Sequence, residues 1–374
     1  MEFIAAKKDF TAALAKAQGI PEQKNLSSVM ANLLVESAGP DTVRLTAQSY
    51  EVTLVTTFPA RVGVEGRMAL SGRSLSDAAR MLPEAPVALK AMPNHWAELT
   101  AGRTEYKVPG ILPENMPERQ EPATTDEVRM PRELLLEMID RVGFAMSADE
   151  GRPNLNGVFV RFDAAEGGVA RVEMVATDGH RLARLVREVS AEGLGQALGV
   201  IVHRKGVAEL KRFLDGVDGD VTVGFQRNAV VFRVATGYLL VRQIELEYPD
   251  YQRVVPADFR WRFTVDRAEL SRAVQRAAIV ISGDKTPLVR MKLEPGRLQV
   301  LAQDPEKGDA HSELDIGYDG ESLEIAYNNK YLLDALNALP AGDVALQVKD
   351  LGSATVVQCP DDPGILQLIM PVRV

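Results

Sequence analysis

The sequence has a single cysteine, Cys359, among 374 residues, which excludes an intrachain disulfide and a zinc site built from several cysteines. It has no run of about 18 uncharged apolar residues, so we expect no transmembrane helix and no membrane partner. The N-terminal segment lacks a basic stretch followed by a long apolar stretch, which predicts no secretory signal peptide. These features predict a cytoplasmic protein.

Motifs for cofactor and metal chemistry are also scarce. Gly193–Gly199 approximates a dinucleotide-binding fingerprint, but acidic residues precede it and a strand-like run follows it where a helix should begin. Ser282–Thr286 lacks the upstream glycine of a phosphate-binding loop and is typical of a turn. The four histidines include no pair at helical i, i+4 spacing. We therefore expect no cofactor, no metal and no catalytic residue.

Thr177–Arg181 is the segment that most resembles an acid–base cluster. Asp178-Gly179 favours a tight turn between strands expected at Val172–Ala176 and Leu182–Val186. The alternative is an enzyme, such as a hydrolase, that uses Asp178 and His180. In that case alanine at His180 would abolish turnover rather than weaken binding of a partner.

The chain contains a pattern that occurs three times, in which a strand-like run is followed by a helical pattern. The first helix of each third is predicted at 7–20, 131–147 and 266–282, and the second at 72–82, 203–216 and 328–340. Alternating segments such as Val43–Ala47 and Val221–Phe225 predict strands between and after the helices. The sequence therefore predicts an α+β fold of three repeated domains, each with two helices packed on antiparallel sheets.

The predicted helices carry a net positive charge, although the whole chain carries −9. This distribution fits helices that face phosphates and bind DNA loosely without reading its sequence. Ordinary solvated helix faces are an equally acceptable interpretation of the charge alone.

The C-terminal segment Leu366–Val374 is apolar and contains Pro371. Leu366 and Leu368 suit a final core strand. Met370-Pro371-Val372 suits a binding surface better, because proline cannot donate to a sheet and methionine adapts to varied partners. Just before it, Cys359–Gly364 has two prolines and two aspartates and predicts an expanded, solvated loop.

Five separated motifs resemble those of the bacterial sliding clamp family, the beta subunits of the replicative DNA polymerase, and they occur in the order found in that family. They are Leu155-Asn156-Gly157, Ala176–Leu182, His203–Val207, Tyr248–Tyr251 and Met370–Arg373. The resemblance extends over essentially the whole chain. It implies domains at 1–120, 127–250 and 258–374 and a head-to-tail homodimer that closes a ring around duplex DNA. It also implies a non-catalytic processivity factor that needs a clamp-loader ATPase and tethers the replicative DNA polymerase and other proteins carrying a clamp-binding motif.

Members of that family bind peptides of the Gln-Leu-x-Leu-Phe type in a groove between the second and third domains. The positions of this sequence that match the groove are Leu155, Thr177, Gly179, His180, Arg181, Leu182, Pro249, Arg253, Val254, Asn328, Tyr331, Leu368, Ile369, Met370, Pro371, Val372 and Arg373. Pro153-Asn154 stands where an aromatic residue is common, which makes that wall of the groove a departure from the pattern.

The resemblance also implies contacts with DNA and with the second subunit. The DNA-contacting candidates are Lys24, Arg73, Arg103, Arg152, Arg204 and Lys205, and Lys24 stands where an arginine is familiar. The dimer-interface candidates are Tyr106 and Val108 of one subunit and Ile279 and Val280 of the other. A third functional class, a monomeric peptide-binding scaffold that never encircles DNA, would keep its function when the basic residues are neutralised.

Overall fold

The computed structural model describes residues 1–21, 28–119, 121–164, 168–190, 197–281 and 287–373. Lys24, Ser282–Thr286, most of Gly193–Gly199 and the last residue lie outside these ranges. The described residues form two compact units. The first contains Met1–Leu134 and Lys205–Gln243, and the second contains Leu135–Val189, Ile244–Val374 and strand β15 (Leu198–His203).

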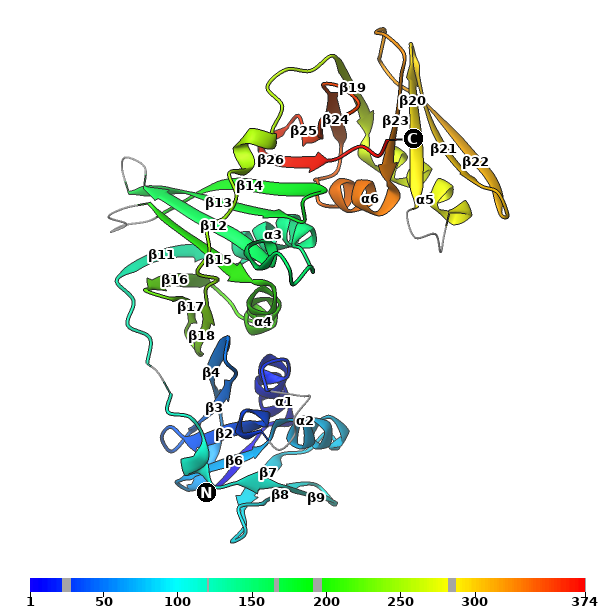
Figure 1. Ribbon diagram of the computed structural model, residues 1–374. Helices are drawn as coiled ribbons and strands as arrows, with labels where there is room; N and C mark the ends of the chain where they lie inside the picture. Colours follow the sequence, from blue (N-terminus) through cyan, green and yellow to red (C-terminus); the bar gives the residue numbers. More distant parts are fainter. Residues whose placement is uncertain (22–27, 120, 165–167, 191–196, 282–286, 374) are drawn as a thin grey trace. The chain divides into compact units, whose positions relative to one another are not determined.

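The first unit has two antiparallel sheets (Figure 1). The five-stranded sheet has the order β5 (Arg61–Val64), β1 (Glu2–Ala5), β7 (Val87–Ala91), β8 (Ala97–Ala101) and β9 (Thr104–Val108). The nine-stranded sheet has the order β10 (Gly110–Ile111), β6 (Arg67–Ser71), β2 (Asn32–Ser37), β3 (Thr42–Gln48), β4 (Val52–Pro59), β18 (Gly237–Arg242), β17 (Ala229–Val234), β16 (Asp220–Gln226) and β11 (Asp126–Pro131). Helices α1 (Lys7–Ala17) and α2 (Gly72–Met81) pack side by side, and α4 (Arg204–Leu214) belongs mainly to the same unit.

The second unit also has two antiparallel sheets. The eight-stranded sheet has the order β15, β12 (Gly157–Ala164), β13 (Val169–Thr177), β14 (Arg181–Ser190), β26 (Asp362–Ile369), β25 (Thr355–Cys359), β24 (Asp343–Val348) and β19 (Trp261–Asp266). The four-stranded sheet has the order β22 (Gly308–Asp315), β21 (Arg297–Asp304), β20 (Leu288–Glu294) and β23 (Leu323–Asn328). Helices α5 (Arg267–Val280) and α6 (Asn329–Asn337) pack together, and most of α3 (Arg132–Val142) lies in this unit.

The prediction of six helices is confirmed within the described residues, although each helix is shorter than its predicted range. Three helix starts are fixed by side-chain caps, because an oxygen of Ser71, Asp266 or Asn328 accepts a hydrogen bond from a backbone N–H of the first turn of α2, α5 or α6. The first helix ends at Ala17, just before Gly19 and Pro21, which disfavour helix. No helix in the described ranges is long and apolar enough to cross a membrane.

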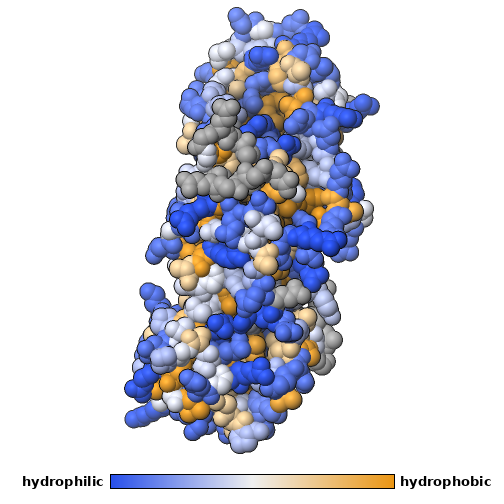
Figure 2. Space-filling model, turned by 90° about the vertical axis from the view of Figure 1, so that its left-hand side faces the viewer, coloured by the Kyte–Doolittle hydropathy of each residue, from blue (hydrophilic) through white to orange (hydrophobic). Residues whose placement is uncertain are grey.

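Aromatic and aliphatic side chains fill the space between helices and sheets. In the first unit, Phe3, Phe10 and Phe58 meet edge to face with ring centroids 5.9–6.2 Å apart, which joins β1, α1 and β4. In the second unit, Tyr327 is buried and its hydroxyl lies 2.6 Å from Thr355 Oγ1. On the face drawn in Figure 2, apolar side chains form separate patches on a largely hydrophilic surface.

The prediction of an expanded loop at Cys359–Gly364 is wrong. The structure has a hairpin there, in which β25 ends at Cys359, β26 starts at Asp362 and these two residues are paired. Asp362 forms an ion pair with Arg187 on β14 at 2.6 Å, and its Oδ1 accepts a hydrogen bond from Gly364 N. A charge partner distant in sequence therefore holds a segment of loop-like composition in the sheet.

Two sheets are continuous between successive thirds of the sequence. Strand β4 of the first third pairs with β18 of the second, for example Leu54 with Leu239. Strand β14 of the second third pairs with β26 of the last, for example Leu182 with Leu368. The second pairing brings the turn before β14 next to the C-terminal segment, and the candidate site lies there.

Candidate functional site

A hollow of about 280 Å³ lies in the second unit where the turn between β13 and β14 meets the end of β26. Apolar side chains dominate its wall. Its lining residues are Leu155, Thr177, Gly179, His180, Arg181, Leu182, Pro249, Asp250, Tyr251, Val254, Ala354, Leu368 and Met370. We call this hollow the β14–β26 groove. Val254 and Met370 are 54% and 37% exposed, so apolar surface is accessible to an extended ligand.

The turn between β13 and β14 is held by its own side chains, as the dipeptide Asp178-Gly179 predicted. Thr177 Oγ1 donates to the carbonyl of Arg181 at 2.6 Å and accepts a hydrogen bond from Gly179 N at 3.1 Å. Asp178 Oδ1 accepts hydrogen bonds from the backbone N–H groups of His180 and Arg181. The carbonyl of His180 then accepts a hydrogen bond from Met370 N at 2.8 Å, which ties the turn to the C-terminal segment.

Arg181 joins this turn to helix α6. Its guanidinium forms ion pairs with Asp178 at 3.0 Å and Asp334 at 2.6 Å and donates to the carbonyl of Phe144 at 2.8 Å. The same guanidinium lies 4.5 Å from the ring centroid of Tyr331. Arg181 is 9% exposed, so these charge-assisted contacts are made away from solvent. They hold the turn and helix α6 together at the back of the groove.

These contacts also argue against the hypothesis that Asp178 and His180 are catalytic residues of an enzyme. Both Asp178 oxygens accept hydrogen bonds from the turn and from Arg181, while the His180 ring stacks on Tyr331 with centroids 6.3 Å apart. This arrangement is typical of a structural turn rather than of an acid–base pair. Among the described residues, no group of three or more His, Cys, Asp or Glu side chains is placed to hold a metal.

Tyr251 forms the floor of the groove on the β13 side, and Tyr248 packs against Tyr251 without lining the groove. Tyr248 stacks on Phe159 with ring centroids 4.9 Å apart and meets Tyr251 edge to face. Burial raises the pKa of Tyr248 above its ordinary value. Burial and then a hydrogen bond to Glu173 raise the pKa of Tyr251 to about 12. Both hydroxyls therefore stay neutral at physiological pH, and the floor carries no charge of its own.

Seven of the predicted groove residues do not line the hollow. Arg253 is exposed beside it, Asn328 caps α6, Tyr331 lies behind His180 and Arg181, and Ile369 is fully buried. Ile369 follows Leu368 on one strand, and successive strand side chains point to opposite faces. The last three, Pro371, Val372 and Arg373, line a separate hollow of about 640 Å³ with Arg290, Glu324, Ile325, Ala326, Leu351 and Gly352.

Three groove residues were missed by the sequence analysis: Asp250, Tyr251 and Ala354. Asp250 and Tyr251 lie inside the motif Tyr248–Tyr251, so the motif itself was a sufficient signal. Ala354 is a small residue just before β25, and no pattern in the sequence marks it.

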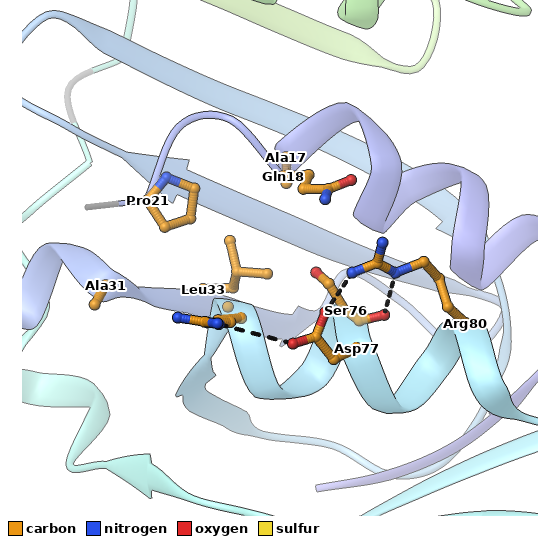
Figure 3. A pocket seen from close by; sticks show the side chains of 10 residues that line it. Ala17, Gln18, Pro21, Ala31, Leu33, Ser76, Asp77 and Arg80 are labelled. Carbon is orange, nitrogen blue, oxygen red and sulfur yellow. Dashed lines mark hydrogen bonds and ion pairs between the residues drawn. The ribbon is translucent and has the colours of Figure 1, made fainter. Parts of the chain in front are cut away.

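A second hollow, of about 340 Å³, lies between α1 and α2 (Figure 3). Its lining includes the DNA-contact candidate Arg73, which lies 3.8 Å from Asp77, while Arg80 donates to the same carboxylate. The other described candidates lie at exposed or partly exposed positions: Arg103 in the turn before β9, Arg152 beside Gly179, and Arg204 and Lys205 at the start of α4.

Family profiles match all three thirds of the chain. The N-terminal, central and C-terminal domains of the DNA polymerase III beta subunit match residues 1–120, 129–250 and 252–373. The chain belongs to the DNA polymerase III beta subunit family. Its fold therefore consists of three beta-subunit domains. Members of this family are non-catalytic accessory subunits of DNA polymerase III.

Individual beta subunits support this assignment over the full length. The beta sliding clamp of Caulobacter vibrioides is 31% identical over 364 residues, covering 97% of each chain. A crystal structure of the C. crescentus beta sliding clamp has a TM-score of 0.92 at 30% identity and covers 100% of this chain and 99% of that one. The beta subunit from Pseudomonas aeruginosa has a TM-score of 0.90 at 28% identity, with both chains fully covered.

Proposed function

We propose that this beta subunit acts as a sliding clamp, a ring that encircles duplex DNA and holds the replicative DNA polymerase on it. The observation that carries the proposal is the β14–β26 groove, because ten of the residues expected to bind partner peptides line one hollow in a chain that matches a beta sliding clamp over 97% of its residues. Topological linkage would replace tight, sequence-specific binding to DNA. Opening and loading the ring would require a separate clamp-loader ATPase.

The groove is suited to short peptides with apolar anchors. Its wall offers leucines, Val254 and Met370, while His180 and Asp250 provide polar groups at the edge. Such a combination binds apolar side chains and fixes their register. The partners would be the polymerase and other replication or repair proteins with peptides of the Gln-Leu-x-Leu-Phe type, competing for one groove in the cytoplasm.

The ring would form from two subunits joined head to tail. Strand β9 ends the five-stranded sheet and β22 ends the four-stranded sheet, so each has an edge able to pair with another chain. Tyr106 is half-buried on β9, Val108 is buried, and Ile279 on α5 is 72% exposed next to half-buried Val280. Two different complementary edges are what a closed head-to-tail interface requires. The three domains would have the boundaries 1–120, 127–250 and 258–374.

Replacing Ile279 with alanine should raise the dissociation constant of the homodimer about a hundredfold, because a head-to-tail ring of two subunits has two such interfaces and burying each Ile279 side chain is worth roughly 1.5 kcal/mol. Sedimentation velocity over a dilution series measures this change. Val64→Ala is the matched control, because Val64 is 52% exposed on β5, the opposite edge of the five-stranded sheet from β9. An equal shift in both variants would reject the proposed interface.

Contact with DNA would be electrostatic and independent of sequence. The cationic groups that would contact phosphates belong to Arg73, Arg103, Arg152, Arg204 and Lys205, which are exposed or partly exposed. Lys24, outside the described residues, is proposed for the same role. Several of these are also in ion pairs, for example Arg152 with Asp149 at 2.9 Å. Loose contacts of this kind suit a ring that moves along the duplex.

The decisive experiment measures retention on DNA. The protein is loaded by a clamp-loader ATPase onto a nicked circular plasmid, and the bound fraction is measured before and after a single restriction cut. We expect retention on the circle and loss after linearisation, because a ring slides off free ends. Equal retention on both forms would mean ordinary DNA binding, and no retention on the circle would favour the scaffold that never encircles DNA.

A further inference from the structure

Glu173 is a buried carboxylate on β13 that does not line the β14–β26 groove. It is 4% exposed. Its Oε1 accepts a hydrogen bond from Arg184 on β14, and its Oε2 accepts one from the hydroxyl of Tyr251 at 2.7 Å. Both carboxylate oxygens of Glu173 therefore accept hydrogen bonds, one from a neighbouring strand of the sheet and one from a residue of the groove floor.

Tyr251 connects this carboxylate to the wall of the groove. It is the first residue of the short helical turn Tyr251–Val254, whose last residue, Val254, lines the groove. The Tyr251 ring packs in a cluster with Val175, Leu182 and Leu368. Packing holds the Tyr251 ring in the floor of the groove. The hydrogen bond from its hydroxyl to Glu173 fixes the position and orientation of the ring within that cluster.

The surroundings keep Glu173 ionised. Arg184 bonds to it, Arg171 lies 3.9 Å away, and Arg161 is its direct cross-strand partner on β12. Burial on its own would raise the pKa of Glu173, but the hydrogen bonds from Arg184 and Tyr251 outweigh burial and hold that pKa below its ordinary value. The bond that Tyr251 donates is therefore charge-assisted and stronger than one to a neutral acceptor.

We infer that Glu173 is a positioning residue for partner peptides. Through Tyr251 it holds the turn Tyr251–Val254 in the place where Val254 and the tyrosine ring form one side of the groove. A peptide then meets a wall already in its binding position and does not have to order that wall on binding. The inference rests on the proposed peptide-binding function of the groove.

The test is a double-mutant cycle on peptide affinity. A fluorescent peptide containing Gln-Leu-Ser-Leu-Phe is titrated with the full-length wild type, Glu173→Gln, Tyr251→Phe and the double variant. We expect each single variant to weaken binding about fivefold. If the two residues act through their shared hydrogen bond, the double variant binds no more weakly than the weaker single variant.

Glu209→Gln is the matched control, because Glu209 is also buried and paired with an arginine, Arg212, but lies on α4 in the first unit. We expect its peptide affinity to equal that of the wild type, whatever its melting temperature. Wild-type affinity in Glu173→Gln, or effects of Glu173→Gln and Tyr251→Phe that multiply, would overturn the inference. Failure of the wild type itself to bind the peptide would instead reject the proposed function of the groove.

Discussion

Replacing Arg181 with alanine should lower the free energy of unfolding by about 3 kcal/mol, at the low end of what removing one partner of a buried ion pair costs. The change leaves Asp178 and Asp334 without their cation and the carbonyl of Phe144 without its donor. Both aspartates keep some contact with solvent, which places the loss at the low end. For a unit of 150–250 residues this corresponds to a fall in melting temperature of roughly 6–12 °C. Differential scanning calorimetry measures it.

Arg253→Ala is the control for this prediction. Arg253 also pairs with an aspartate three residues earlier, Asp250, at 2.8 Å, but its side chain is 84% exposed. Exposed ion pairs are typically worth about 0–1 kcal/mol, so the melting temperature should change by no more than about 4 °C. Similar losses in both variants would mean that burial of Arg181 is not what gives its ion pairs their strength.

The helices and the first strands could be predicted because their signals are local. Apolar residues at helical spacing gave all six helices, and the dipeptide Asp178-Gly179 gave the turn between β13 and β14. The groove residues came largely from motifs shared with a family. Their placement in one hollow depends on β14 pairing with β26, far apart in sequence, which no local pattern specifies.

The misses have the same physical origin. In the hairpin at Cys359–Asp362, Asp362 pairs with Arg187, which lies 175 residues away in sequence. The hydrogen bond between Tyr251 and Glu173 joins residues 78 positions apart, so no local pattern predicts it. Ile369 was included together with its neighbours Leu368 and Met370, although alternation along a strand turns every second side chain to the opposite face. Local patterns predicted the helices and strands, whereas the pairing of strands distant in sequence determines which side chains come into contact.

Replacing Gly179 with alanine should weaken peptide binding about tenfold or more, which corresponds to about 1.4 kcal/mol or more of binding free energy. Gly179 has φ of +89°, where a residue with a side chain is strained by about 1–2 kcal/mol. A Cβ there would also lie 2.7 Å from Nη1 of Arg152. The turn would relax and carry with it the carbonyl of His180, which holds Met370 at the groove. Fluorescence polarisation with the labelled peptide measures the affinity.

Gly296→Ala separates backbone strain from the effect on the groove. Gly296 has φ of +78° in the turn between β20 and β21, and a Cβ there would meet nothing within 4 Å. It should lower the melting temperature about as much as Gly179→Ala while leaving peptide affinity unchanged. If both variants lost affinity equally, the loss would come from general destabilisation of the unit. If Gly179→Ala alone lost affinity, the β13–β14 turn would be the element that shapes the groove for its peptide.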